Sequence, residues 1–199
     1  MAEDLEELKE VLKRVVGKIL ATEKILHSLN FQIWIVIMSG YYLIIAPLEK
    51  IPVWLTICYW TVGTIVFIYI TRSVWRRVSL LISEGNIRGI NVGILISWII
   101  ASILGWFLVP SMLDAQFLQR LAVGLLSFLS LGVLGMMITI YLNTKRIAIE
   151  MIPAAAIPAL LIPAVFFVKG NPMDFAGMCA VFSYGTTVII YIYRAFKVA

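Results

Sequence analysis

Six long apolar runs dominate the chain, and each is free of charged side chains. An α-helix rises about 1.5 Å per residue, so an uncharged run of about 18–22 residues can cross a hydrocarbon core about 30 Å thick. Each run is therefore predicted to form one membrane-spanning helix. The runs comprise residues 29–48, 53–70, 90–109, 121–142, 151–168 and 175–192.

The composition agrees with this pattern. Hydrophobic residues make up 62% of the 199 residues and charged residues 14%, whereas soluble proteins average about 45–50% apolar and about 25% charged residues. We therefore expect an all-α polytopic membrane protein with six transmembrane helices arranged as three hairpins. Residues 1–28 are expected to form a cytoplasmic amphipathic helix, and residues 29–199 the six-helix transmembrane domain.

The positions of Lys and Arg predict the orientation of these helices. Of the 16 basic residues, all except Lys50, Arg120 and Lys169 fall within residues 1–28, 71–89, 143–150 and 193–199. Cytoplasmic loops are enriched in Lys and Arg, so both termini are predicted to be cytoplasmic. The net charge of +5 then lies mainly on that side, where we expect contact with anionic lipid headgroups and not with nucleic acid.

The N-terminal segment carries a heptad pattern. Apolar residues recur at alternating spacings of three and four, with Thr22 filling one gap, at Leu5, Leu8, Leu12, Val15, Ile19, Leu26 and Leu29. This spacing predicts a helix with one apolar face. The helix can lie on the membrane surface or on the helix bundle. Alternatively, it can self-associate as a coiled coil that continues into the first membrane helix.

The predicted cytoplasmic loop 71–89 contains a second amphipathic element. Val74, Val78, Leu81 and Ile82 share one face, bordered by Trp75 and by the basic residues Arg72, Arg76 and Arg77. Trp and Arg side chains often anchor a helix at the membrane surface. We therefore expect these residues to form a lipid or partner interface, with Gly85 and Asn86 ending the helix.

Small residues recur every fourth position along the third run, at Gly89, Gly93, Ser97, Ala101 and Gly105. Four residues advance a helix by about 400°, so these positions form one slowly winding groove along which another helix can approach closely. The fourth run offers a complementary set of small residues at Gly124, Ser127, Ser130, Gly132 and Gly135. The partner helix can lie in the same chain or in another subunit.

The fifth run is interrupted by proline at Pro153, Pro158 and Pro163. Proline lacks a backbone N–H, so this helix is expected to bend and to leave carbonyl groups that need other partners. Such a helix either packs as a simple kink or lines a cavity. The candidate cavity lining is completed by Asn91, Thr186 and Thr187. Trp34, Trp60 and Trp98 lie deep in their runs and can pack the bundle or stack on an apolar ligand.

Charged groups that serve intramembrane chemistry are absent from the six runs. Proton relays use intramembrane charges, and hydrolases or transferases need a base, a metal or paired acids. One histidine, His27, and two cysteines give no ligand set for a metal or a haem. We therefore predict no catalytic residues, no metal and no cofactor, and we interpret His27 as an interfacial side chain.

Two functions fit these features. The first is a small transport protein, acting as a binding component, channel or facilitator for a neutral or apolar solute. The second is a non-catalytic subunit or assembly factor of a larger membrane complex, assembled as a homo-oligomer or with partner membrane subunits. In helix number and in the position of both termini, the chain resembles the substrate-binding components of energy-coupling-factor vitamin transporters. This resemblance implies small-solute binding and extends to no motif.

Overall fold

The computed structural model describes residues 2–45, 52–81 and 87–199, and this part of the chain is all-α. Within it, six helices are long and apolar enough to cross a membrane. The six candidate spans are Glu6–Ile45, Val53–Val74, Gly89–Ser111, Phe117–Thr144, Ile149–Phe167 and Pro172–Val198.

The first two helices extend beyond the apolar runs that predict them. Helix α1 runs unbroken over Ala2–Gly40 and continues as a π-helical segment, Tyr41–Ile45, so the N-terminal helix and the first span are one element. Helix α2 covers Val53–Leu81, and the amphipathic element expected after residue 70 is its last part, not a separate helix. The charged flanks are rich in Glu, Lys and Arg, which are good helix formers. The turn expected at Gly85 and Asn86 lies outside the described residues.

The remaining helices also exceed their apolar runs, with one exception. Helix α3, Ile87–Ile103, continues through a π-helical segment, Leu104–Leu108, into the short α4, Val109–Ser111. Helix α5 covers Phe117–Thr144 and α7 covers Pro172–Val198. Helix α6 is the exception, because it covers only Ile152–Leu161, between 3₁₀ turns at Ile149–Met151 and Pro163–Phe167.

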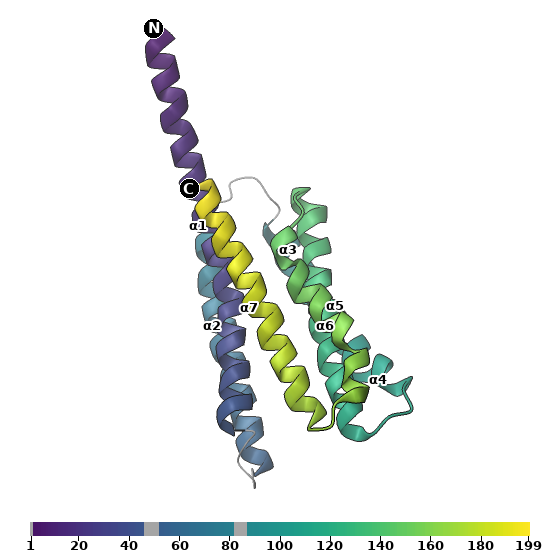
Figure 1. The fold of residues 1–199 in the computed structure, drawn as a ribbon. Helices are drawn as coiled ribbons and strands as arrows, with labels where there is room; N and C mark the ends of the chain where they lie inside the picture. The colour runs from purple at the N-terminus through teal and green to yellow at the C-terminus, as the bar shows by residue number, and fades with distance from the viewer. Residues whose placement is uncertain (1, 46–51, 82–86) are drawn as a thin grey trace.

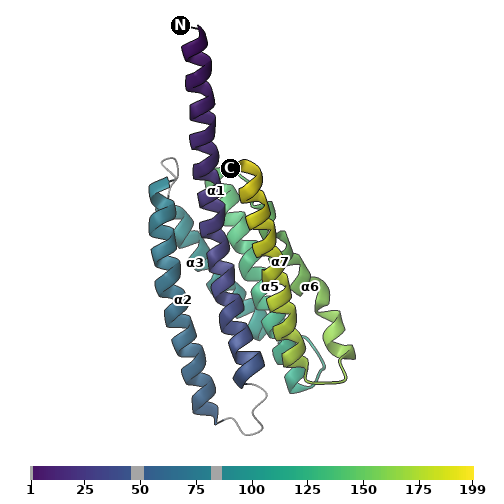
Figure 2. The same ribbon diagram turned by 60° about the vertical axis from the view of Figure 1, so that its left-hand side comes forward.

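The longest interface joins the two ends of the chain (Figure 1). Helices α1 and α7 pack antiparallel, because a Cβ placed on Gly17 would meet Val198, and one on Gly177 would meet the ring of Tyr42. Helix α3 packs along α5, and α6 lies against α5 and α7. Helix α2 packs on the side of α1, and the first turns of α1 project beyond the C-terminus (Figure 2).

The hydrophobic core forms where α1, α5, α6 and α7 meet. Its most deeply buried large side chains include Met38 of α1, Leu126 and Leu129 of α5, and Tyr184 of α7. Alanines such as Ala154 and Ala180 let the backbones of α6 and α7 approach their neighbours. The candidate span of α2 lies outside this core.

The small residues of α3 lie against α5. A Cβ on Gly93 would come within 2.5 Å of Thr139 Cγ2, and the hydroxyl groups of Ser97 and Thr139 are 3.2 Å apart. Gly105 approaches the backbone of α5, because an added Cβ would be 2.5 Å from the backbone nitrogen of Phe128. The groove along α3 is therefore filled by a helix of the same chain.

The prolines shape α6. Pro158 lies inside the helix and has no N–H to offer the carbonyl of Ala154. The carbonyl of Ala155, the residue after Ala154, accepts a 2.7 Å hydrogen bond from the hydroxyl of Ser130 in α5. The α-helix ends two residues before Pro163, and the chain continues as a 3₁₀ turn. A neighbouring helix thus supplies polar contact where the prolines weaken the backbone ladder.

We predict that Gly105→Ala destabilises the protein by about 1–3 kcal/mol, because backbone atoms of Phe128 cannot rotate away from the new methyl group. Gly185→Ala in α7 is the matched control, since no atom beyond its own helix lies within 4 Å of the added Cβ. Thermal unfolding in one detergent measures both variants. Equal loss of stability in the two would contradict the close α3–α5 approach.

Gly93→Leu is expected to disrupt folding more severely than Gly105→Ala, because its larger side chain would meet Thr139 of α5.

Candidate binding cavity

A cavity of about 250 Å³ lies inside the bundle. Its walls come from α1, α2, α3, α5 and α7, with Met151 contributing from the turn before α6. Because these helices are distant in sequence, the cavity depends on the assembled fold and not on a local motif.

Aromatic rings make up much of the lining. Phe31 and Tyr184 meet edge to face with ring centroids 5.2 Å apart, and Trp34 tilts against Phe67 at 4.8 Å. Trp98 lines the cavity and packs against Phe128 of α5. Aromatic and apolar walls with a few polar groups are typical of small-molecule sites.

The polar lining gathers at one end of the cavity. His27, Asn30, Thr71 and Asn91 lie on the parts of α1, α2 and α3 nearest the chain termini. One or two turns away from these residues, toward the other end of the bundle, the lining residues of α2 and α3 are apolar, including Phe67, Leu95 and Trp98. The cavity is therefore amphipathic, with a polar end and an apolar end.

Three polar atoms of the lining are buried without a hydrogen bond. They are Asn30 Oδ1, Trp34 Nε1 and Thr71 Oγ1, none of which has a partner among the described residues. Leaving a buried polar group unpaired costs about 1–3 kcal/mol, so most such groups in folded proteins are satisfied. Together they offer one acceptor, one donor and one hydroxyl group to a molecule in the cavity.

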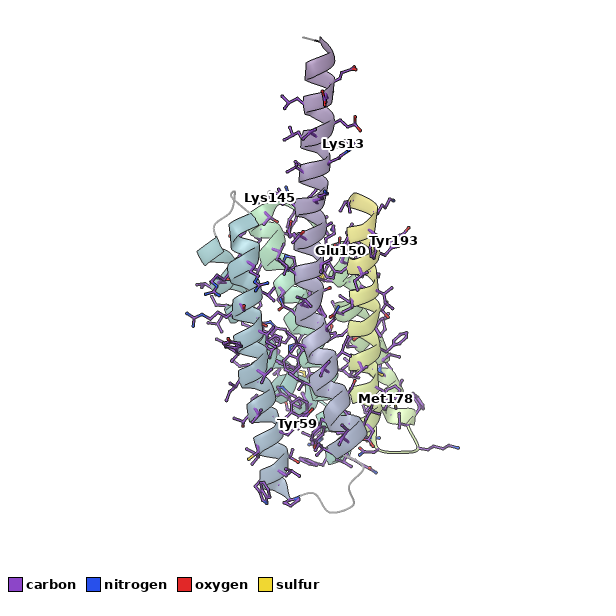
Figure 3. The ribbon with its side chains drawn as sticks, turned by 90° about the vertical axis from the view of Figure 1, so that its left-hand side faces the viewer. Lys13, Tyr59, Lys145, Glu150, Met178 and Tyr193 are labelled. Carbon is purple, nitrogen blue, oxygen red and sulfur yellow. The ribbon has the colours of Figure 1, made fainter. Side chains whose placement is uncertain are left out.

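An ion cluster lies beside the polar end of the cavity. The carboxylate of Glu150 is 5% exposed, and its Oε1 accepts hydrogen bonds from Lys24 and, at 3.3 Å, from Arg194. Figure 3 shows Glu150 between α1 and α7, on the side of the bundle from which Lys13 projects. The neighbouring residue, Met151, forms cavity wall. The cluster thus fixes α1 and α7 next to the cavity.

His27 connects the cavity to the charged groups around it. It lines the cavity, stacks on Tyr191 with ring centroids 6.2 Å apart, and lies 3.8 Å from the carboxylate of Glu23.

Of the six residues predicted as the candidate cavity lining, Asn91 alone lines this cavity. Trp34 and Trp98, expected either to pack the bundle or to stack on a ligand, also line it, and Trp60 does not. Pro158 is buried in α6, whereas Pro153 is half-buried and Pro163 is exposed. Thr186 donates to the carbonyl of Phe182 in its own helix. Thr187 is fully buried between the turns of Tyr184 and Tyr191, and its hydroxyl has no hydrogen-bond partner in the described part of the chain.

The expected lipid or partner interface lies on the last turns of α2. Arg72, Arg76 and Arg77 are exposed there. The side chain of Trp75 lies outside the described part of the structure.

Several important residues are not predicted by the sequence patterns. Asn30 and Gln32 are the two amides of the first apolar run, and a polar side chain in a membrane segment is itself a signal of function. Glu150 is the single acidic residue of the segment 143–150, directly before the fifth run. Phe67, Tyr184 and Tyr191 carry no sequence signal, because aromatic residues are common in membrane helices.

The described residues contain no group of three His, Cys, Asp or Glu side chains that could hold a metal ion. No protein-family model, curated protein or solved structure matches the chain. The resemblance to vitamin-transporter components therefore rests on helix number and predicted termini alone. Function is argued below from the cavity itself.

We predict that Glu150→Gln destabilises the protein by about 1–3 kcal/mol, because Lys24 and Arg194 lose the carboxylate that pairs them. Both cations are partly exposed, so water offsets some of the loss. Glu10→Gln is the control, since its pair with Arg14 is exposed and its removal should change stability by less than about 0.5 kcal/mol. Chemical unfolding in detergent compares the two. Matching effects would show that the buried cluster contributes no more than a surface pair.

Proposed function

We propose that this protein is a multi-pass integral membrane protein that binds a neutral, largely apolar molecule in the cavity, as a transport-type binding component, channel or facilitator. The observation that carries this proposal is an aromatic cavity in which Asn30, Trp34 and Thr71 present unpaired polar atoms. No enzymatic activity, metal or cofactor is part of the proposal.

The chemistry of the lining favours an uncharged ligand. Within the described residues, the lining contains no Asp, Glu, Lys or Arg. A charged molecule would lose its hydration without gaining a counter-ion, which is costly in a membrane interior. An uncharged molecule with an apolar body can cover the rings of Phe67 and Trp98. Its hydrogen-bonding group can satisfy the polar atoms at the other end.

We further propose that the six spans form three hairpins with both termini cytoplasmic. The ends of the chain lie on the same side of the bundle (Figure 1), and the exposed Arg72, Arg76 and Arg77 lie near that side, where anionic headgroups would attract them. This orientation predicts that a protease-sensitive tag at either end is protected in right-side-out vesicles and cleaved in inverted ones. Cleavage of only one tag in inverted vesicles would contradict an even number of spans.

The ligand proposal is tested with the full chain in mild detergent. Native mass spectrometry should show the protein carrying a small molecule, whose mass identifies its class. Asn30→Leu should weaken binding of that molecule by about 5–30-fold, the loss of one hydrogen bond with a buried partner. Thr186→Val is the matched control, because Thr186 bonds within its own helix and does not line the cavity.

Two results would overturn the ligand proposal. One is a protein that neither binds nor passes any member of a broad panel of neutral solutes when reconstituted in liposomes. The other is binding that Asn30→Leu and Thr186→Val weaken equally, since the cavity would then not be the site.

A second function, as a non-catalytic subunit or assembly factor, is favoured by the projecting part of α1. Leu8 and Leu12 on its heptad face are 66% and 61% exposed, and α7 packs on the opposite face at Gly17. An amphipathic helix of this kind is stabilised mainly by covering its apolar face. A homo-oligomer or partner membrane subunits would provide that cover. Leu8→Ser together with Leu12→Ser should then reduce the mass of the complex extracted from native membranes.

A further inference from the structure

The walls of the cavity differ sharply in exposure. On α1, α2, α5 and α7 none of the lining residues is exposed, and Phe31, Val133 and Tyr184 are at most 7% exposed. On α3, by contrast, the lining residues Asn91 and Leu95 are exposed, Leu95 to 61%. A residue that both lines a cavity and faces outward marks the side on which the cavity opens.

The opening lies between α2 and α3. Helix α2 packs against α1, and α3 packs against α5, so neither helix covers the other's lining residues closely. Phe67 and Thr71 of α2 form one border of the opening, and Asn91 and Leu95 of α3 the other. All four residues fall within candidate membrane spans. With these spans in a bilayer, as proposed above, the opening faces lipid.

We infer that the ligand is a neutral amphiphile dissolved in the bilayer, which reaches the cavity sideways between α2 and α3. This inference rests on the proposed function and specifies its ligand class and route. A solute dissolved in water would need a path along the bundle axis. There the Glu150 cluster and the buried Met151 lie at the polar end, and Val133 and Tyr184 at the other.

The polarity of the opening matches the two parts of an amphiphile. Asn91 lies at the start of its span, and Leu95 lies one turn, about 6 Å, further into the hydrocarbon. Asn30 and Thr71 flank the same polar end inside the cavity. A hydroxyl head would donate to Asn30 Oδ1 and accept from the Trp34 N–H and the Thr71 hydroxyl. Its apolar body would then lie over Trp98. The cavity is small for a ligand pocket, so a long chain would extend through the opening into the bilayer.

The test is photolabelling of the full-length protein in phosphatidylcholine vesicles that contain hexadecanol bearing a diazirine near its hydroxyl group. A light flash after increasing times in the dark gives the rate of access, and peptide mapping locates the label. We expect label on the cavity-lining parts of α1 and α7. A second probe, with the diazirine at the chain end, should label α2 and α3 around the opening.

Two variants at Leu95 test the route in opposite directions. Leu95→Trp should slow labelling by about tenfold or more, because the larger ring narrows the opening, whereas Leu95→Ala should speed it. Ile99→Trp is the matched control, since Ile99 is 51% exposed on the same helix but does not line the cavity. The opposite signs keep the test decisive if the Trp variant folds poorly.

The possible failures are distinguishable. Cavity labelling that Asn30→Leu abolishes but both Leu95 variants leave unchanged overturns the lateral route and leaves the proposed function standing. Failure of the hexadecanol probes to label the cavity, with binding of benzyl alcohol added from water, overturns the amphiphile class alone. Absence of binding by both alcohols, together with no co-purified molecule, removes the proposed function as well.

Discussion

The carboxylate of Glu150 pairs with Lys24 near the start of the chain and with Arg194 near its end. A largely buried charge is tolerated only when it is paired, so burying this carboxylate requires α1, α7 and the turn before α6 to meet at one point. That meeting aligns α1 with α7 over their shared length. It also places Met151, His27 and Tyr191 at the polar end of the cavity. The site thus depends on an interaction that does not belong to its lining.

The α3–α5 interface and the surroundings of the cavity are packed by residues of different size. Between α3 and α5, Gly93, Gly105 and Gly135 let backbones come together with no space left over. Around the cavity, by contrast, large rings such as Trp34 of α1 and Trp98 of α3 form the lining. Rings are stiff and fill space unevenly, so a set of them encloses a void more readily than aliphatic side chains do. Small residues therefore bring α3 and α5 into close contact, whereas aromatic residues of α1, α2, α3 and α7 surround the cavity.

The sequence predicts the all-α class and six spans because 18 or more apolar residues in a row have few other stable arrangements. The lengths of α1 and α2 are not predicted, since apolar runs mark only the part suited to hydrocarbon, while helices continue through Glu, Lys and Arg. Asn91 is found from its polarity within an apolar run. Tyr184, Tyr191 and Phe67 could not be found, because only the assembled bundle decides which of many aromatic residues face a cavity. The prolines of α6 alter its backbone, and Ser130 of α5 donates a hydrogen bond to the carbonyl of Ala155 beside them.

The unbroken course of α1 determines which features of the protein lie on the same helix. At about 1.5 Å per residue, its 39 residues form a rod about 58 Å long, and Asn30 and Trp34 stand on the same rod as Leu8. Helix α1 has no proline between Leu8 and Trp34, and the one glycine there, Gly17, packs against Val198 of α7. Along this helix Lys24, which pairs with Glu150, lies between the projecting end and the cavity-lining Asn30. One continuous helix therefore carries the exposed heptad face, the ion pair with Glu150 and part of the cavity wall, in that order.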